Sequence, residues 1–177
     1  NLGHDNQVKI SLDLLCGIYA HAERYTDAMS LLNAYPEMWR TPWTAQAQVG
    51  AGAFEEVMRY LPQETLDKLA TTHIWDRFGY LIAWAMLLGS DCELSRVDGP
   101  STKCTMSSEE RAALALEILS EVRSNEHFGS VTCKQADRLL ARLRSQVGVN
   151  GAALDENAQA VRSVQELAQE LLTIRLG

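Results

Sequence analysis

The feature that most constrains the fold is a pair of apolar runs joined by a short polar hinge near the N-terminus. Residues 14–39 read LLCGIYAHAERYTDAMSLLNAYPEMW, and the hinge is HAERYTD. Tyr19 and Ala28 lie nine positions apart on either side of it. In a helical hairpin, a small residue at such a position lets the two helices approach, while an aromatic ring fills the groove beside the turn. The spacing therefore predicts a closely packed helical hairpin over residues 7–36, with a structural role.

Helix signals continue along most of the chain. Thr41 and Pro42 suit the N-cap and the first position of a helix, because the N–H that proline lacks would have no partner there. We expect Thr26 to cap the second helix of the hairpin, and Ser107 or Ser108 to cap a later helix. These positions divide the chain into several short helical segments.

Residues 73–89, HIWDRFGYLIAWAMLLG, are apolar on most sides, which is typical of a central helix covered by its neighbours. Residues 89–107 are expected to form one irregular loop, and residues 154–176 the last helix. No stretch shows the two-residue alternation of a half-buried strand. We therefore predict an all-α fold of stacked helical hairpins, with roughly seven to nine helices in a single domain over residues 1–177.

The charge balance limits the possible partners. The formal net charge is −7 and the isoelectric point is about 5.1, so the chain as a whole repels a phosphate backbone. The longest charge-free apolar run, residues 79–90, is well short of the roughly 20 residues that cross a bilayer. These totals disfavour a transmembrane segment and make RNA an unfavourable partner, although they leave room for a local basic strip.

The four cysteines form no clear metal or redox motif. Cys16 sits in an apolar run and is expected to be a buried small hydrophobe. Cys92 and Cys104 bracket the predicted loop and could pair if the protein were exported, although scattered cysteines fit a reducing compartment equally well. Together with Cys133 and His127 they could bind zinc, but no CxxC arm is present. We predict no metal and no other cofactor.

No pattern supports an enzymatic reaction. His73 and Asp76 lie three residues apart on a predicted helix and could form an acid–base or metal pair, but no second pair accompanies them. The stretch VGAGAF lacks the preceding strand, the lysine and the spacing of a phosphate-binding loop. We therefore predict no catalytic residues, no cofactor-binding residues and no small-molecule substrate.

One candidate contact surface is a basic stripe. Lys134, Arg138 and Arg142 recur every four residues, so they line one side of a predicted helix. This pattern is typical of a solvated helix face. It would also suit an acidic protein partner or RNA phosphates.

A second candidate surface lies at the turn formed by Trp39, Arg40 and Trp43. Tryptophan and arginine are enriched at the energetic centres of protein interfaces. The alternative is that both tryptophans fill the gap between adjacent hairpins. We include the predicted loop, residues 89–106, among the segments that could contact a partner.

The hairpin resembles a pentatricopeptide or tetratricopeptide repeat. RYTDA, residues 24–28, is similar to the basic–apolar–acidic–acidic–alanine hinge of the pentatricopeptide family, and Leu15, Tyr19, Ala28 and Leu32 fall on tetratricopeptide offsets. Two residues depart from the family pattern. Glu23 replaces its glycine, and Leu14 stands where an RNA-reading repeat has a small polar residue. The resemblance therefore implies a repeat scaffold more than a reader of bases.

In size and helical-repeat character the chain is also similar to the extra repeat-type subunits on the catalytic sector of euglenozoan mitochondrial ATP synthase. This resemblance implies a non-catalytic structural subunit that binds the alpha subunit of the synthase. It also implies a location on the matrix side of the inner membrane, after removal of a presequence. Two alternatives stay open: an organellar RNA-binding pentatricopeptide-type protein, and a helical adaptor domain of a longer protein.

Overall fold

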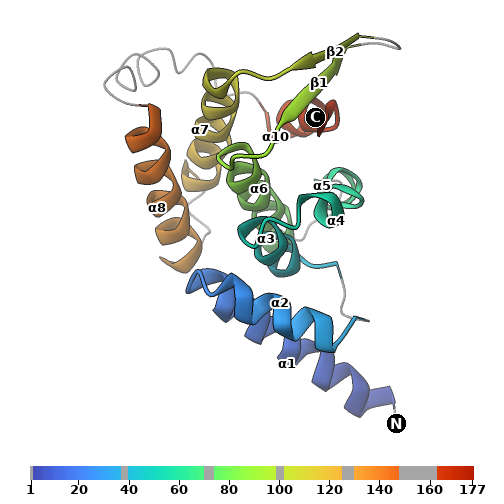
Figure 1. Cartoon of the computed structure of the whole chain (residues 1–177). Coiled ribbons are helices and arrows are strands. Elements are labelled where there is room, and N and C mark those ends of the chain that lie inside the picture. The colour runs from blue at the N-terminus through green and yellow to red at the C-terminus, as the bar shows by residue number, and fades with distance from the viewer. Residues whose placement is uncertain (1, 37–39, 70–73, 99–101, 125–129, 148–162) are drawn as a thin grey trace.

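A computed structural model describes residues 2–36, 40–69, 74–98, 102–124, 130–147 and 163–177 of the chain. These residues form nine α-helices and a sheet of three short strands, so the prediction of a predominantly all-α protein with seven to nine helices is confirmed (Figure 1). The helices are α1 Leu2–His21, α2 Tyr25–Ala34, α3 Pro42–Gly50, α4 Phe54–Met58, α5 Leu61–Leu69, α6 Ile74–Leu88, α7 Ser108–Ser124, α8 Ser130–Val147 and α10 Val164–Leu171. The strands are β1 Leu94–Asp98, β2 Thr102–Thr105 and β3 Ile174–Leu176.

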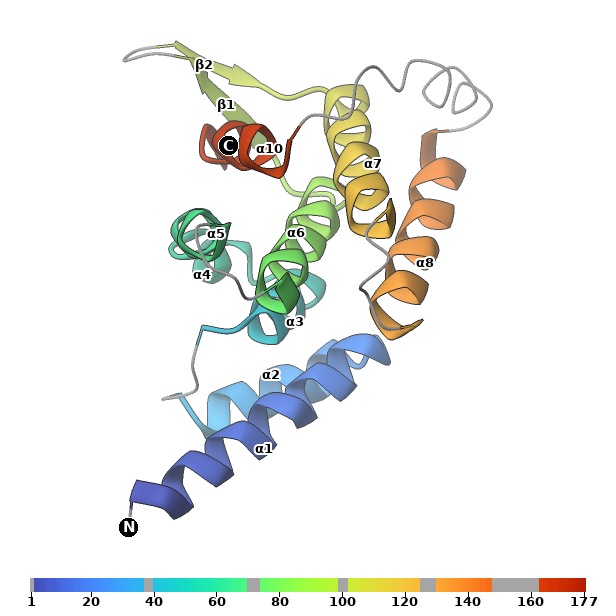
Figure 2. The same cartoon turned by 180° about the vertical axis from the view of Figure 1, so that it is seen from behind.

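The first two helices form the hairpin that the opening stretch predicts. Ala28 is fully buried and shares a small core with Cys16 of α1 and Ala47 of α3, against which the Tyr19 ring packs. Burial raises the pKa of the Cys16 thiol to about 12, which agrees with its expected role as a small hydrophobe. In Figures 1 and 2, α1 and α2 run side by side beneath α3 and the end of α8.

The main core is built around α6, as its apolar sequence predicts. Phe78, Tyr80 and Trp84 are among the largest side chains that are almost completely buried. The helix packs against α3, α5, α7 and α8, and it lies between them in both views of the molecule (Figures 1 and 2). At the end of this helix, Arg111 donates hydrogen bonds to the carbonyls of Leu88, Ser90 and Cys92, where the chain turns away.

The prediction of an entirely strand-free chain was wrong at two places. Within residues 89–107, β1 and β2 pair antiparallel, with Arg96 opposite Cys104. Residues 174–176 leave the predicted last helix to pair with the other edge of β1, so that Ser95 faces Arg175. The strands have only three to five residues each, too few to show a period-2 pattern, and β3 comes from the far end of the chain.

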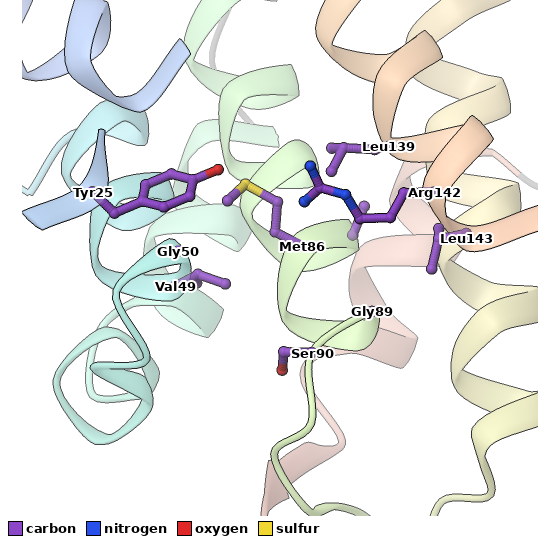
Figure 3. A pocket seen from close by; sticks show the side chains of 10 residues that line it. Tyr25, Val49, Gly50, Met86, Gly89, Ser90, Leu139, Arg142 and Leu143 are labelled. Atoms are coloured by element: carbon purple, nitrogen blue, oxygen red, sulfur yellow. The ribbon is translucent and has the colours of Figure 1, made fainter. Parts of the chain in front are cut away.

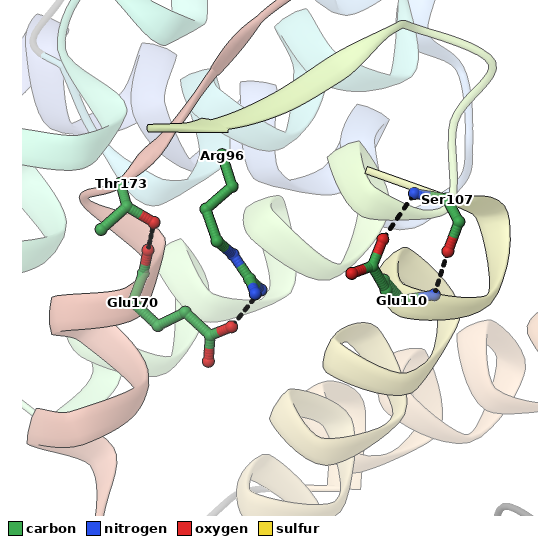
Figure 4. A network of polar contacts seen from close by, with 5 residues as sticks. All are labelled: Arg96, Ser107, Glu110, Glu170 and Thr173. Atoms are coloured by element: carbon green, nitrogen blue, oxygen red, sulfur yellow. Dashed lines mark hydrogen bonds and ion pairs between the residues drawn. The ribbon is translucent and has the colours of Figure 1, made fainter. Parts of the chain in front are cut away.

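Helix starts follow the capping signals in two of three places. The Thr41 hydroxyl accepts a hydrogen bond from the Thr44 N–H, in a capping box with proline at the first position. Ser107 and Glu110 exchange a similar pair of hydrogen bonds at the start of α7 (Figure 4). Thr26 does not cap α2, because that helix already begins at Tyr25, and no side chain caps it.

One ion pair fastens the sheet to the last helix. Arg96 of β1 contacts the Glu170 carboxylate of α10, and Thr173 bonds back to the Glu170 carbonyl just before β3 begins (Figure 4). The sheet and α10 therefore lie together at one end of the molecule, where α10 packs against α5 and β3 against α4. None of the helices in the described part of the chain is both long and apolar enough to span a membrane.

Candidate protein-docking site

Helix α1 carries most of the large apolar side chains that the structure leaves exposed. Four of them lie on this helix and are listed here with their exposed fractions: Val8 41%, Ile10 48%, Leu14 60% and Ile18 62%. Ile10, Leu14 and Ile18 follow one another at intervals of four residues, so they form one stripe along the helix. We call this surface, with the exposed Gln7 and Ser11 beside it, the α1 outer face.

The charged side chains of α1 lie away from the centre of this stripe. Lys9 projects about 180° from Ile18 around the helix and Asp13 about 100° from Leu14, and both are partly buried. The α1 outer face therefore has no charged side chain among the residues whose burial is described. Water-exposed helix faces are usually polar or charged, and clustered exposed apolar residues mark interaction sites.

One flank of the α1 outer face is fixed to the rest of the molecule. The Thr41 hydroxyl donates a hydrogen bond of 2.5 Å to Asp13. The Trp43 ring packs so closely on Gly17 that a Cβ there would lie 3.1 Å from it. Because α1 is anchored along this side, the α1 outer face is presented by a rigid element.

Burial changes the acid–base behaviour of two partly buried groups of α1. Desolvation raises the pKa of Asp13, the hydrogen bond from Thr41 lowers it, and the charge of Asp76 raises it further. Desolvation lowers the pKa of His21, as does the positive charge of Arg138. The His21 ring stacks edge-on against Trp43, with 4.8 Å between ring centroids, and its Nδ1 is buried without a hydrogen-bond partner.

Of the three residues predicted at the tryptophan turn, the structure describes Arg40 and Trp43. Trp43 is half-buried between α1 and α3, the packing role given above as the alternative. Arg40 is exposed, with its guanidinium 5.3 Å from the centre of the Tyr60 ring. Trp39 lies outside the described residues.

The basic stripe is partly used inside the molecule. Arg138 donates a hydrogen bond of 3.1 Å to the His21 carbonyl, and Arg142 binds the Glu23 carboxylate at 2.9 and 3.0 Å. Lys134 is exposed on the same helix. Two of the three residues of the basic stripe therefore connect α8 to the end of α1, and all three side chains are exposed to solvent.

Other candidate chemistry finds no site in the described residues. No group of three metal-ligating side chains occurs among them. All four cysteines are free thiols, so Cys92 and Cys104 are not paired in this structure. His127 and His73, which were considered above as a zinc ligand and as an acid–base residue, lie outside the described residues. Asp76 lies 3.7 Å from the Lys68 ammonium, which is a structural ion pair.

A shallow cavity of about 170 Å³ lies between α2, α3, α6 and α8 (Figure 3). Its lining is mostly apolar, with the Tyr25 ring, Met86 and the Arg142 guanidinium around it. Ligand pockets usually measure about 300–1,000 Å³. The cavity is smaller than that, and its one charged group already binds Glu23, so we assign no ligand to it.

The α1 outer face is the surface that the sequence analysis missed. From the sequence, Leu14 was interpreted only as a residue that does not suit recognition of an RNA base. The available signal was the spread of apolar residues around the first helix, since Ile10, Leu14 and Ile18 fall on the side opposite Cys16 and Ala20. A helix in a hairpin needs one apolar side for its neighbours, and this helix has a second.

Comparison with models of protein families, with characterised proteins and with solved structures gave no match. The repeat resemblance therefore depends on the residues of the hairpin itself.

Proposed function

We propose that this chain is a non-catalytic helical protein that binds another protein through the α1 outer face. The observation that carries the proposal is the uncharged apolar stripe of Ile10, Leu14 and Ile18 on a helix that is anchored through Asp13 and Gly17. An amphipathic helix that docks into an apolar groove uses anchors at this kind of spacing. Burial of these side chains by a partner would remove apolar surface from water, which is the main favourable term in association.

The resemblance to repeat-type subunits gives this proposal its most specific form. In that form the partner is the alpha subunit of mitochondrial ATP synthase, and the chain is a structural component on the matrix side of the inner membrane. Support comes from the hairpin sequence and the helical character of the chain, together with Leu14, which suits contact with a protein better than contact with a base.

The test is to isolate the tagged full chain from its source under gentle conditions and identify what accompanies it at fixed stoichiometry. We expect the parent chain to co-purify with a protein partner. The Leu14→Asp variant should lose that partner, because binding would bury a carboxylate that has no counter-charge, which is strongly unfavourable. Leu66→Asp is the matched control, since Leu66 is an exposed leucine on α5. A partner retained equally by both variants would contradict the assignment of this surface.

RNA binding is the second candidate, and the exposed stripe of Lys134, Arg138 and Arg142 is the observation that favours it. Affinity based on phosphate contacts should fall steeply as salt rises. Recovery of RNA that nuclease removes, and that Arg138→Ala and Arg142→Ala weaken, would support this function. Absence of RNA binding at low salt would exclude it.

A further inference from the structure

We propose that Glu23 is an intramolecular competitor for the basic stripe of α8, because its carboxylate holds Arg142 where a phosphate of single-stranded RNA would otherwise bind. The basic stripe consists of Lys134, Arg138 and Arg142, all exposed. The inference rests on the second candidate function, RNA binding, and adds to it an internal contact that limits the affinity. It makes no use of the α1 outer face.

The contact between Glu23 and Arg142 has the chemistry of an arginine–anion site. The Arg142 Nη2 atom donates hydrogen bonds to both carboxylate oxygens of Glu23, at 3.0 and 2.9 Å. A phosphate group also presents charged oxygen acceptors, and arginine binds carboxylates and phosphates with the same donors. The Glu23 carboxylate and a phosphate of RNA would therefore compete for the Arg142 guanidinium.

Glu23 is an unusual residue for its position in the chain. Its φ of 56° lies in the left-handed region, where glycine is the usual residue after a helix. Residues in such sparsely populated conformations are concentrated at ligand clamps and switch regions, where the surrounding contacts hold them in place. A glycine here would also end α1, but it would supply no carboxylate to Arg142. The glutamate thus places a negative charge on the basic stripe in an unfavourable backbone conformation.

The contact is exposed enough for a ligand to displace the glutamate. The side chains of Arg142 and Glu23 are 51% and 39% exposed, and such ion pairs contribute little stability because water and salt screen them. Arg138 makes a different contact with the hairpin, since it donates to the uncharged carbonyl of His21. Of these two contacts, the one through Glu23 is therefore the one that cancels a positive charge of the stripe.

The charge balance of the chain gives this carboxylate its importance. The net charge is −7, so the field of the whole chain repels RNA and any attraction depends on the local positive charge of the basic stripe. Each phosphate that a basic side chain neutralises releases counterions and adds to the affinity. Removal of the Glu23 charge should therefore let Arg142 contribute fully to RNA binding.

The experiment compares two substitutions that change the net charge equally in the full chain. Glu23→Gln releases Arg142, whereas Asp27→Asn breaks an exposed 2.7 Å ion pair with Arg24 of the hairpin and leaves the stripe unchanged. Binding of a fluorescently labelled single-stranded RNA of about 16 nucleotides is measured by anisotropy at low salt. We expect Glu23→Gln to bind roughly two- to five-fold more tightly than Asp27→Asn. This ratio corresponds to about 0.4–1 kcal/mol, which is the range of an exposed ion pair.

A second substitution shows whether the gain in affinity acts through Arg142. In an Arg142→Ala background there is no guanidinium to release, so Glu23→Gln and Asp27→Asn should bind the RNA equally. Urea unfolding of each variant checks that the fold is retained. A gain for Glu23→Gln that persists in this background would overturn the inference, because it would then be an effect of overall charge.

The failure of the inference and the failure of the RNA-binding candidate give different results. If the parent chain binds the RNA and Arg138→Ala weakens it, but Glu23→Gln and Asp27→Asn bind alike, RNA binding stands and the inference is overturned. If neither the parent chain nor Glu23→Gln binds the RNA at low salt, both are overturned.

Discussion

Arg142 of α8 holds Glu23 at the point where the chain leaves α1. Its Nη2 lies 3.0 and 2.9 Å from the two carboxylate oxygens. Glu23 has a φ of 56°, the one positive value that the described non-glycine residues show. Glycine is the usual residue for this left-handed conformation after a helix, and it is the residue that the pentatricopeptide pattern has here. The ion pair thus joins α8 to a position where glutamate is conformationally unfavourable.

Replacement of Glu23 separates the contribution of the ion pair from the cost of the left-handed backbone conformation. Glu23→Ala removes the ion pair and keeps a side chain in the left-handed region, so we expect a loss of about 0.5 kcal/mol, typical of an exposed pair. Glu23→Gly also removes the pair but relieves a backbone cost of about 1–2 kcal/mol. Glycine should therefore be more stable than alanine by about 1 kcal/mol, as measured by urea unfolding. Equal stability of the two variants would show that the backbone at this position is not strained.

The hairpin and the central helix were predictable because their signals are local. Tyr19, Ala28 and the caps at Thr41 and Ser107 act within one or two helical turns, and α6 has no charged residue from Phe78 to Leu88. The sheet was not predictable, because β1 pairs with β3 from the far end of the chain. Short strands whose partners are distant leave no periodic trace in the sequence.

The candidate site was harder to predict than the fold. A sequence shows that Ile10, Leu14 and Ile18 share one side of a helix, but it does not show which side the neighbouring helices cover. That depended on Asp13 bonding to Thr41 and on Gly17 accepting the Trp43 ring. The predicted basic stripe exists, yet two of its side chains also bind the end of α1, a contact between residues more than 100 positions apart.

A buried hydrogen bond between α5 and α6 gives a second prediction. The Trp84 indole N–H donates to the Thr65 hydroxyl at 3.0 Å, and that hydroxyl donates to the Leu61 carbonyl at 2.6 Å. Thr65→Val keeps the shape of the side chain but leaves the indole N–H without a partner. We expect a loss of about 1–3 kcal/mol in unfolding free energy.

Thr65→Ser is the matched control for that substitution, because it keeps the hydroxyl and removes only a methyl group. Thr65→Ser should lower the unfolding free energy less than Thr65→Val does in the same chemical denaturation experiment. The reverse order would mean that the methyl packing, and not the hydrogen bond to Trp84, stabilises this contact.

The close approach of α3 and α6 gives a third prediction. A Cβ on Gly79 would lie 2.4 Å from the Pro42 Cβ, at the first position of α3 where the chain is held by the capping box. Gly79→Ala should therefore destabilise the protein by about 1–3 kcal/mol, as overpacking does, despite alanine's better helix propensity. In a Pro42→Gly background the same substitution should cost less, and a thermodynamic cycle measures the difference. An unchanged cost would show that the clash does not lie with Pro42.

The last prediction concerns pH. Burial and the charge of Arg138 lower the pKa of His21 below its ordinary value of 6.5, so the folded chain binds this proton less readily than the unfolded chain. Between the two pKa values the unfolded state holds more protons, and stability therefore falls as the pH drops below about 6.5. The raised pKa of Asp13 acts in the opposite direction, but nearer its ordinary value of 3.8.

His21→Phe tests this, because phenylalanine keeps a ring against Trp43 and removes the titrating group. Urea unfolding at pH 7.5 and at pH 5.5 should show a smaller loss of stability on acidification for the variant than for the parent chain. The other three histidines are present in both proteins, so the difference between the two losses belongs to His21. Equal losses would mean that His21 accepts a proton as easily in the folded chain as in the unfolded one, and that its ring is hydrated where it meets α3 and α8.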